Sequence, residues 1–116
     1  MTSAAQYARY SSDHQSSASI ADQLRVCREQ AAREGWTVTA CYHDAALSGA
    51  SMILRPGIQA LLADARVGSF EVVMAEALDR ISRDQADVAT LFKHLHFAGV
   101  RIVTLAEGEI SELHVG

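Results

Sequence analysis

The sequence predicts one α/β domain of three layers, in which a mostly parallel central sheet of four to five strands carries helices on both faces. The chain has 116 residues, 49% of them apolar and 21% charged. This length suits one domain with a sizeable core and leaves little room for a second. Short apolar runs alternate with amphipathic segments of helical period. Strands separated by helices in this way pair in parallel through right-handed crossovers.

The first half of the chain predicts two strands with a helix between them. A strand is expected over Ala4–Tyr10 and a polar loop over Ser11–Ser17, followed by a helix that ends near Glu34. Its apolar face recurs at i, i+4, i+7 and i+11 and consists of Ile20, Leu24, Cys27 and Ala31. Gly35 stands at the C′ position, and a second strand is expected over Val38–Tyr42.

The second half predicts two further helices, each followed or preceded by a short strand. Pro56 suits the first helical position, and the apolar face after it consists of Ile58, Leu61, Leu62 and Ala65, before Gly68. A buried strand is expected over Phe70–Ala75. Asp84 is a candidate N-cap for a helix whose apolar stripe is Val88, Leu91, Phe92 and Leu95, closed by Gly99. The last clear strand is expected over Arg101–Leu105, and residues 106–116 have no periodicity.

Composition excludes several classes of protein. No apolar run is long enough to span a bilayer, and no leader precedes the first strand, so we expect neither a membrane protein nor a secreted one. Cys27 and Cys41 are too far apart for a CxxC site and are expected to be buried thiols in the cytoplasm. The five His residues have no partners at ligand spacing, and there is no Gly-rich phosphate loop. We therefore expect no metal and no cofactor.

The net charge of −4 argues against binding nucleic acid through the whole surface. However, nine of the ten basic residues are Arg and only Lys93 is Lys. Arginine suits planar, bidentate recognition of phosphate or carboxylate. The same bias also arises from a GC-rich genome, so composition alone leaves both explanations open.

Ligands of open parallel sheets bind beyond the carboxyl ends of the strands, which places the candidate site in the loops that follow the strands. Arg9 and Ser11 are two residues apart at the end of the first strand, so their side chains point to the same side. They fit a nucleophile beside a phosphate-binding guanidinium, or simply a polar strand end.

Arg80 and Arg83 would be i, i+3 neighbours if a helix begins near Asp79. Positive charge at the positive end of a helix dipole indicates an anionic ligand, although a solvated helix start is the alternative. Arg55 precedes Pro56 and could reach the same edge, but alone it is a typical surface arginine. Gln23, beside the apolar Leu24, reads by itself as an amide at the boundary of the core.

Several motifs together resemble the serine recombinases of the resolvase/invertase family. They follow in the family's order along most of the chain: Tyr7-Ala8-Arg9-Tyr10-Ser11-Ser12-Asp13, Ser19-Ile20-Ala21-Asp22-Gln23, Asp44, Leu47-Ser48-Gly49, Arg55-Pro56-Gly57 and Leu78-Asp79-Arg80-Ile81-Ser82-Arg83-Asp84. The style of the motifs, and the ending Ile110-Ser111-Glu112-Leu113-His114-Val115-Gly116, are most similar to the large serine recombinases.

The resemblance implies site-specific, metal-independent DNA cleavage and rejoining. Ser11 would attack a DNA phosphodiester and form a 5′-phosphoseryl link, while Arg9, Arg80 and Arg83 would surround the phosphate. Asp79 would be a candidate for proton transfer, although it could equally orient an arginine. Arg55, Gln23 and Ser48 would be phosphate-binding or supporting residues.

The family continues into a long dimerisation helix and separate DNA-binding domains. Residues 1–116 are therefore expected to be the catalytic domain, truncated before these parts. The implied partners are DNA and further copies of the chain, as a dimer on DNA and a tetrameric synapse in the full-length protein. A non-catalytic module of the same fold, serving assembly or regulation, is the alternative. A phosphate-binding enzyme acting on small molecules is a weaker one, because the sequence has no nucleotide loop.

Overall fold

The computed structural model describes residues 2–9, 17–44, 55–82 and 84–111. The secondary-structure elements are β1 (Ser3–Arg9), α1 (Ser17–Glu34), β2 (Thr37–Asp44), α2 (Pro56–Arg66), β3 (Val72–Ala75), α3 (Leu78–Ile81), α4 (Gln85–Phe97), β4 (Arg101–Thr104) and β5 (Gly108–Glu109). At least one helix separates each strand from the next as far as β4, which is the pattern that the sequence predicts.

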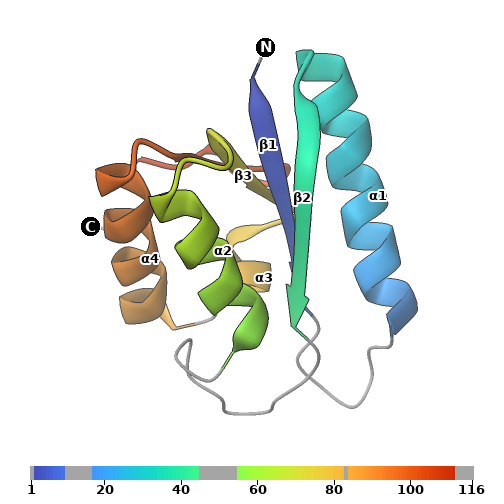
Figure 1. Ribbon diagram of the computed structural model, residues 1–116. Coiled ribbons are helices and arrows are strands. Elements are labelled where there is room, and N and C mark those ends of the chain that lie inside the picture. The colour runs from blue at the N-terminus through green and yellow to red at the C-terminus, as the bar shows by residue number, and fades with distance from the viewer. Residues whose placement is uncertain (1, 10–16, 45–54, 83, 112–116) are drawn as a thin grey trace.

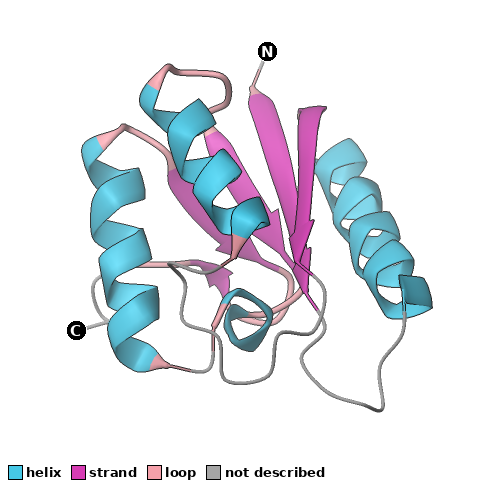
Figure 2. Ribbon diagram, turned by 60° about the horizontal axis from the view of Figure 1, so that its bottom comes forward, coloured by secondary structure: helices cyan, strands magenta, loops and turns pink. Residues whose placement is uncertain are grey.

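The sheet has five strands in the order β2-β1-β3-β4-β5. The first three pairings along this order are parallel, and only β5 runs antiparallel, beside β4. Helix α1 covers one face of the sheet, and α2 and α4 cover the other (Figures 1 and 2). The predicted fold class, a three-layer α/β domain with a mostly parallel sheet, is confirmed.

Each face of the sheet has its own apolar core. On the side of α2 and α4 the larger core includes Tyr7, Ile58, Leu61, Phe70 and Leu95, all almost fully buried. The smaller core under α1 is made of Ala4, Cys27, Ala31, Val72 and Met74. Alternate residues of β1 therefore face opposite layers, and all six residues from Ala4 to Arg9 are buried, as a central parallel strand requires.

The structure adds to the predicted local structure in two places and contradicts it in one. The tail contains strand β5, whose two residues take their conformation from pairing with β4, a contact that periodicity does not reveal. Helix α3 ends at Ile81 because Ser82 is extended (φ −165°, ψ 150°), and Arg83, the expected i, i+3 neighbour of Arg80, lies outside the described residues. Cys27 is buried as predicted, but Cys41 is exposed, because it lies on the edge strand β2.

The helix starts are fixed by carboxylates. Asp84 caps α4 as predicted, its Oδ1 accepting from the N–H of Ala86 at 2.8 Å. Helix α2 has no cap from its own N-cap residue, Arg55. Instead Asp44, the last residue of β2, accepts from the N–H of Gly57 at 2.7 Å and of Ile58 at 3.1 Å.

Gly57 is required by this close approach of α2 to β2. A Cβ atom there would lie 2.8 Å from Asp44 Oδ2 and would collide with the backbone carbonyl of His43.

Among the described helices, none combines the length and apolar content that a bilayer crossing needs.

Candidate active site

Polar residues gather at the edge of the sheet where the parallel strands end. Arg9 is the last residue of β1, Asp44 is the last residue of β2, and Glu76 follows β3 directly. Asp44 lies opposite Arg9 in the strand register. Because parallel strands end at the same edge, residues far apart in the sequence meet there.

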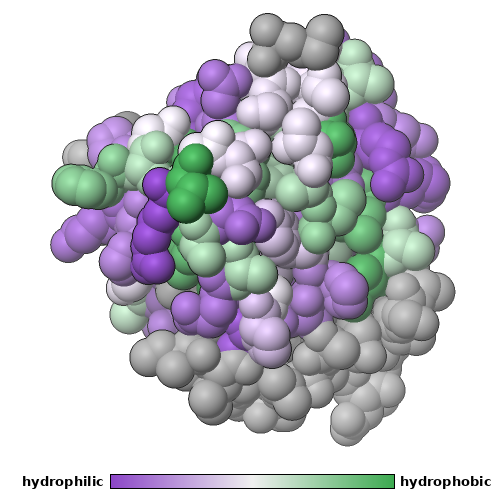
Figure 3. All heavy atoms as spheres, in the orientation of Figure 1, coloured by the Kyte–Doolittle hydropathy of each residue, from purple (hydrophilic) through white to green (hydrophobic). Residues whose placement is uncertain are grey.

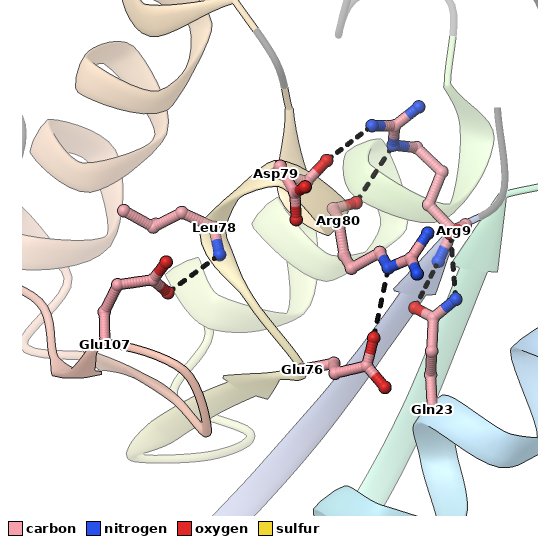
Figure 4. Close-up of polar contacts among 7 residues, drawn as sticks. All are labelled: Arg9, Gln23, Glu76, Leu78, Asp79, Arg80 and Glu107. Carbon is pink, nitrogen blue, oxygen red and sulfur yellow. Dashed lines mark hydrogen bonds and ion pairs between the residues drawn. The ribbon is translucent and has the colours of Figure 1, made fainter.

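Gln23 of α1 holds the end of β1 through both atoms of its amide. Its Nε2 donates to the Arg9 carbonyl at 3.0 Å, and its Oε1 accepts from the Arg9 N–H at 3.2 Å (Figure 4). Only 1% of Gln23 is exposed. The sequence context alone indicates an amide at the boundary of the core, but the structure buries it. It pairs with the backbone of Arg9 as a neighbouring strand would and so holds the last residue of β1 in place.

The Arg9 side chain bonds to the backbone of α3. Its Nη2 donates to the Asp79 carbonyl at 2.7 Å, and its Nε donates to the Arg80 carbonyl at 2.9 Å. The last carbonyls of a helix have no partner within the helix, and cations are favourable beside them. Arg9 therefore ties the end of β1 to the helix that carries Asp79 and Arg80.

Arg55 supplies a second guanidinium to the same helix end. Its Nη1 donates to the Ile81 carbonyl, and only 7% of the residue is exposed. Arg55 is thus a buried residue of the site and not the surface arginine that its sequence context alone indicates. Three successive carbonyls of α3 accept from two arginines that come from different parts of the chain.

Glu107 holds the other end of α3. From the turn between β4 and β5, its Oε1 accepts from the Leu78 N–H at 3.0 Å and from Thr104 Oγ1 at 2.6 Å. The four-residue helix therefore has a carboxylate at its amino end and two guanidinium groups at its carboxyl end. Both arrangements match the sign of the helix dipole.

The charged side chains carried by α3 differ in their surroundings. Arg80 is partly buried, and its Nε lies 3.2 Å from Glu76 Oε1. Asp79 is exposed, and its carbonyl, rather than its carboxylate, accepts from Arg9. Of the two acids, Glu76 contacts an arginine through its carboxylate, whereas Asp79 contacts one through its backbone carbonyl.

Tyr7 and Asp44 form a buried polar pair behind the arginines. The Tyr7 hydroxyl donates to Asp44 Oδ2 at 2.8 Å. Burial raises the pKa of Tyr7, and the hydrogen bond to Asp44 and its negative charge add to this effect, while Arg55 opposes it. Tyr7 is therefore a neutral donor at physiological pH, and Asp44 links the ends of β1, β2 and α2.

Five of the eight candidate site residues lie together in the described structure: Arg9, Gln23, Arg55, Asp79 and Arg80. The other three, Ser11, Ser48 and Arg83, lie outside the described residues. Sequence reasoning missed Glu76 and Glu107. The i, i+4 spacing of Glu76 and Arg80 is a signal that could have revealed the first.

Chemically, this edge holds permanently charged guanidinium groups in fixed directions, beside the carboxylates of Asp44, Glu76 and Asp79. Carbonyls are neutral dipoles, so the bonds from Arg9 and Arg55 orient these side chains without cancelling their charge. Such an arrangement is suited to hold an anion such as a phosphate. Among the described residues, no three His, Cys, Asp or Glu side chains are grouped so as to hold a metal ion.

A protein-family model matches almost the whole chain. The model described as "Resolvase, N terminal domain" matches residues 4–114. The chain belongs to this family. The resolvase match covers all the described elements except the first residue of β1, and it confirms the resemblance to serine recombinases. A comparison with curated protein sequences gives no match.

Solved structures agree with the family. The chain is similar to the N-terminal catalytic domain of TP901-1 integrase, with 30% sequence identity and a TM-score of 0.80. The match covers 91% of this chain and 78% of that one. It is also similar to the C-terminal catalytic domain of ISC1926 TnpA, an IS607-like serine recombinase, with 26% identity, a TM-score of 0.79, and coverage of 89% and 69%. A resolvase-family recombinase from Streptococcus pneumoniae, at 21% identity and TM-score 0.82, covering 99% and 81%, shares the fold.

Proposed function

We propose that this chain is the catalytic domain of a site-specific DNA recombinase that uses Ser11 as its nucleophile. The observation that carries the proposal is the gathering of Arg9, Arg55 and Arg80 at the edge where β1 ends, two residues before Ser11 in the sequence. Family membership and the similarity to serine recombinase catalytic domains support the same conclusion.

In the proposed reaction the Ser11 hydroxyl oxygen attacks the phosphorus of a DNA phosphodiester. The new Oγ–P bond gives a 5′-phosphoserine, and the P–O3′ bond breaks. The proton lost by Ser11 balances the proton gained by the leaving 3′-oxygen, and Asp79, exposed on α3, is the proposed group for proton transfer. Rejoining is the reverse attack by a 3′-hydroxyl.

The arginines suit this reaction, because phosphoryl transfer depends mainly on positioning and on neutralising charge. Arginine remains protonated at all physiological pH values, so it supplies charge without exchanging a proton. Arg9, Arg80 and Arg83 are proposed to surround the phosphate. Arg55, Gln23 and Ser48 are proposed to support them, with no metal or cofactor.

The proposed partner is DNA, to which the full-length protein would bind as a dimer before forming a tetrameric synapse. A non-catalytic module of this fold is the second candidate, and one observation favours it. Arg9 and Arg55 both bond to backbone carbonyls of α3, which is also what purely structural arginines do.

The test separates these candidates with an activated phosphodiester that needs no DNA recognition. The chain and its Ser11→Ala variant are incubated with bis(4-nitrophenyl) phosphate and with random-sequence duplex DNA, both in EDTA. Peptide mass spectrometry should find a phosphoryl adduct on Ser11 in the parent chain and no adduct in Ser11→Ala. Absence of an adduct in the parent chain, or its persistence in Ser11→Ala, would favour the non-catalytic module.

A further inference from the structure

Glu76 stands on a fixed piece of backbone at the edge of the site. It follows the buried strand β3, and its carbonyl accepts from the N–H of Ala106 at 3.1 Å. The preceding carbonyl, of Ala75, accepts from the N–H of Leu105 at 3.2 Å. The turn between β4 and β5 thus holds the base of the Glu76 side chain in place.

Arg80 is also fixed through its backbone. Its N–H donates to the Ala77 carbonyl at 3.1 Å, and its carbonyl accepts from Arg9 Nε. The direction of its long side chain is set further out, where Nε donates to Glu76 Oε1 at 3.2 Å. Figure 4 shows the Arg80 guanidinium between Glu76 on one side and the end of β1, with Arg9 and Gln23, on the other.

We propose that Glu76 is a positioning residue for Arg80, an inference that rests on the proposed function. By accepting from Nε, the guanidinium nitrogen nearest the side-chain stem, the carboxylate turns the outer Nη edge toward the end of β1, where the phosphate is proposed to bind. Both pair members are partly shielded, with 25% of the Arg80 and 38% of the Glu76 side chain exposed.

The opposite role would be competition, in which Glu76 occupies Arg80 and must be displaced by the phosphate. A competing carboxylate gains most from the bidentate geometry that guanidinium groups offer. The contact here is a single bond through Nε. The two roles predict opposite effects of removing the carboxylate, because loss of a competitor raises the reaction rate and loss of a positioning group lowers it.

The first experiment measures the rate of Ser11 adduct formation from saturating bis(4-nitrophenyl) phosphate. Glu76→Ala should lower this rate at least about tenfold, since small errors in the position of a catalytic group are costly. Glu76→Gln should restore it to within about threefold of the parent chain, because the amide oxygen still accepts from Nε. Glu29→Ala, which breaks the exposed Arg25–Glu29 pair of α1, is the matched control and should leave the rate unchanged.

An unchanged or higher rate in Glu76→Ala, while Ser11→Ala abolishes the adduct, would overturn the inference and leave the proposed function standing. An absence of adduct in the parent chain would instead count against the proposed function. In that case NMR of the arginine Nε–H groups decides the inference. Proton exchange with water at Arg80 Nε should be faster in Glu76→Ala than in the parent chain and Glu29→Ala, and equal rates would reject the positioning role.

Discussion

Two buried guanidinium groups hold the centre of this site through backbone carbonyls. Burying a charge without hydrogen-bond partners is costly, so buried arginines need acceptors in fixed places. Arg9 and Arg55 find them in the carbonyls of residues 79, 80 and 81, which the short helix leaves without partners of its own. The same bonds orient the arginines and stabilise the helix, so structural and catalytic roles do not exclude each other here.

At the residue scale, the buried Cys27 predicts a loss of stability at alkaline pH. Burial, and less strongly the charges of Glu76 and Cys41, raises the pKa of this thiol from 9.0 to about 12. Its contribution to folding is therefore complete below about pH 9 and is lost as the pH rises toward 12. Urea unfolding at several pH values should show the free energy of unfolding falling above about pH 9.

Cys27→Ala is the variant that isolates this effect. The variant should be less stable at neutral pH because it leaves a cavity, but its free energy of unfolding should fall less steeply between about pH 9 and pH 11. Tyr7 and Tyr42, whose pKa values are also raised by burial, contribute equally to both proteins at higher pH. Equal slopes for the two proteins would show that Cys27 does not cause the fall.

At the element scale, α3 depends on its neighbours. A helix of four residues is not stable alone, because the free-energy cost of helix nucleation exceeds the stabilisation that one turn provides. Glu107→Ala removes the acceptor of the Leu78 N–H and should lower the free energy of unfolding by about 1 kcal/mol, as loss of a helix cap does. Hydrogen exchange at the amide of Leu78 should become faster.

Glu109→Ala is the matched control for this change. Glu109 lies two residues away on β5 and pairs with Arg101 at 3.2 Å, with both side chains about half exposed. Exposed pairs of this kind contribute about 0 to 1 kcal/mol, and amide exchange at Leu78 should not change. If both variants alter that exchange equally, the turn as a whole rather than the Glu107 carboxylate supports α3.

The elements also show what the sequence could predict. Helices α1, α2 and α4 have apolar faces long enough to reveal the helical period. Pro56 marks the start of α2, and Asp84 marks the start of α4. The period says nothing about contacts between distant segments. The pairing of β5 with β4, the capping of α2 by Asp44, and the burial of Gln23 and Arg55 all depend on such contacts. Strand ends and motif resemblance together indicate the candidate site residues, whereas the contacts of Glu76 and Glu107 depend on the assembled strands.

At the scale of the whole molecule, three arginines form a local cluster in an acidic chain. The chain carries a net charge of −4, while Arg9, Arg55 and Arg80 meet at one edge of the sheet. On the face seen in Figure 3, hydrophilic and apolar side chains are interspersed, with a hydrophilic area over α1 at the right. An acidic domain with one cluster of arginines should contact few phosphates, because most of its surface repels DNA.

This distribution predicts a weak dependence of DNA binding on salt. Each phosphate that a protein neutralises adds about −0.9 to the slope of log Kobs against log salt concentration, so a local cluster should give a slope between about −1 and −4. Fluorescence anisotropy with a random-sequence duplex measures this slope. Arg80→Ala should make it less negative by about 1, whereas Arg33→Ala, in the last turn of α1, should leave it unchanged. A slope steeper than about −6, or equal effects of both variants, would mean that DNA lies across a much wider surface than this edge.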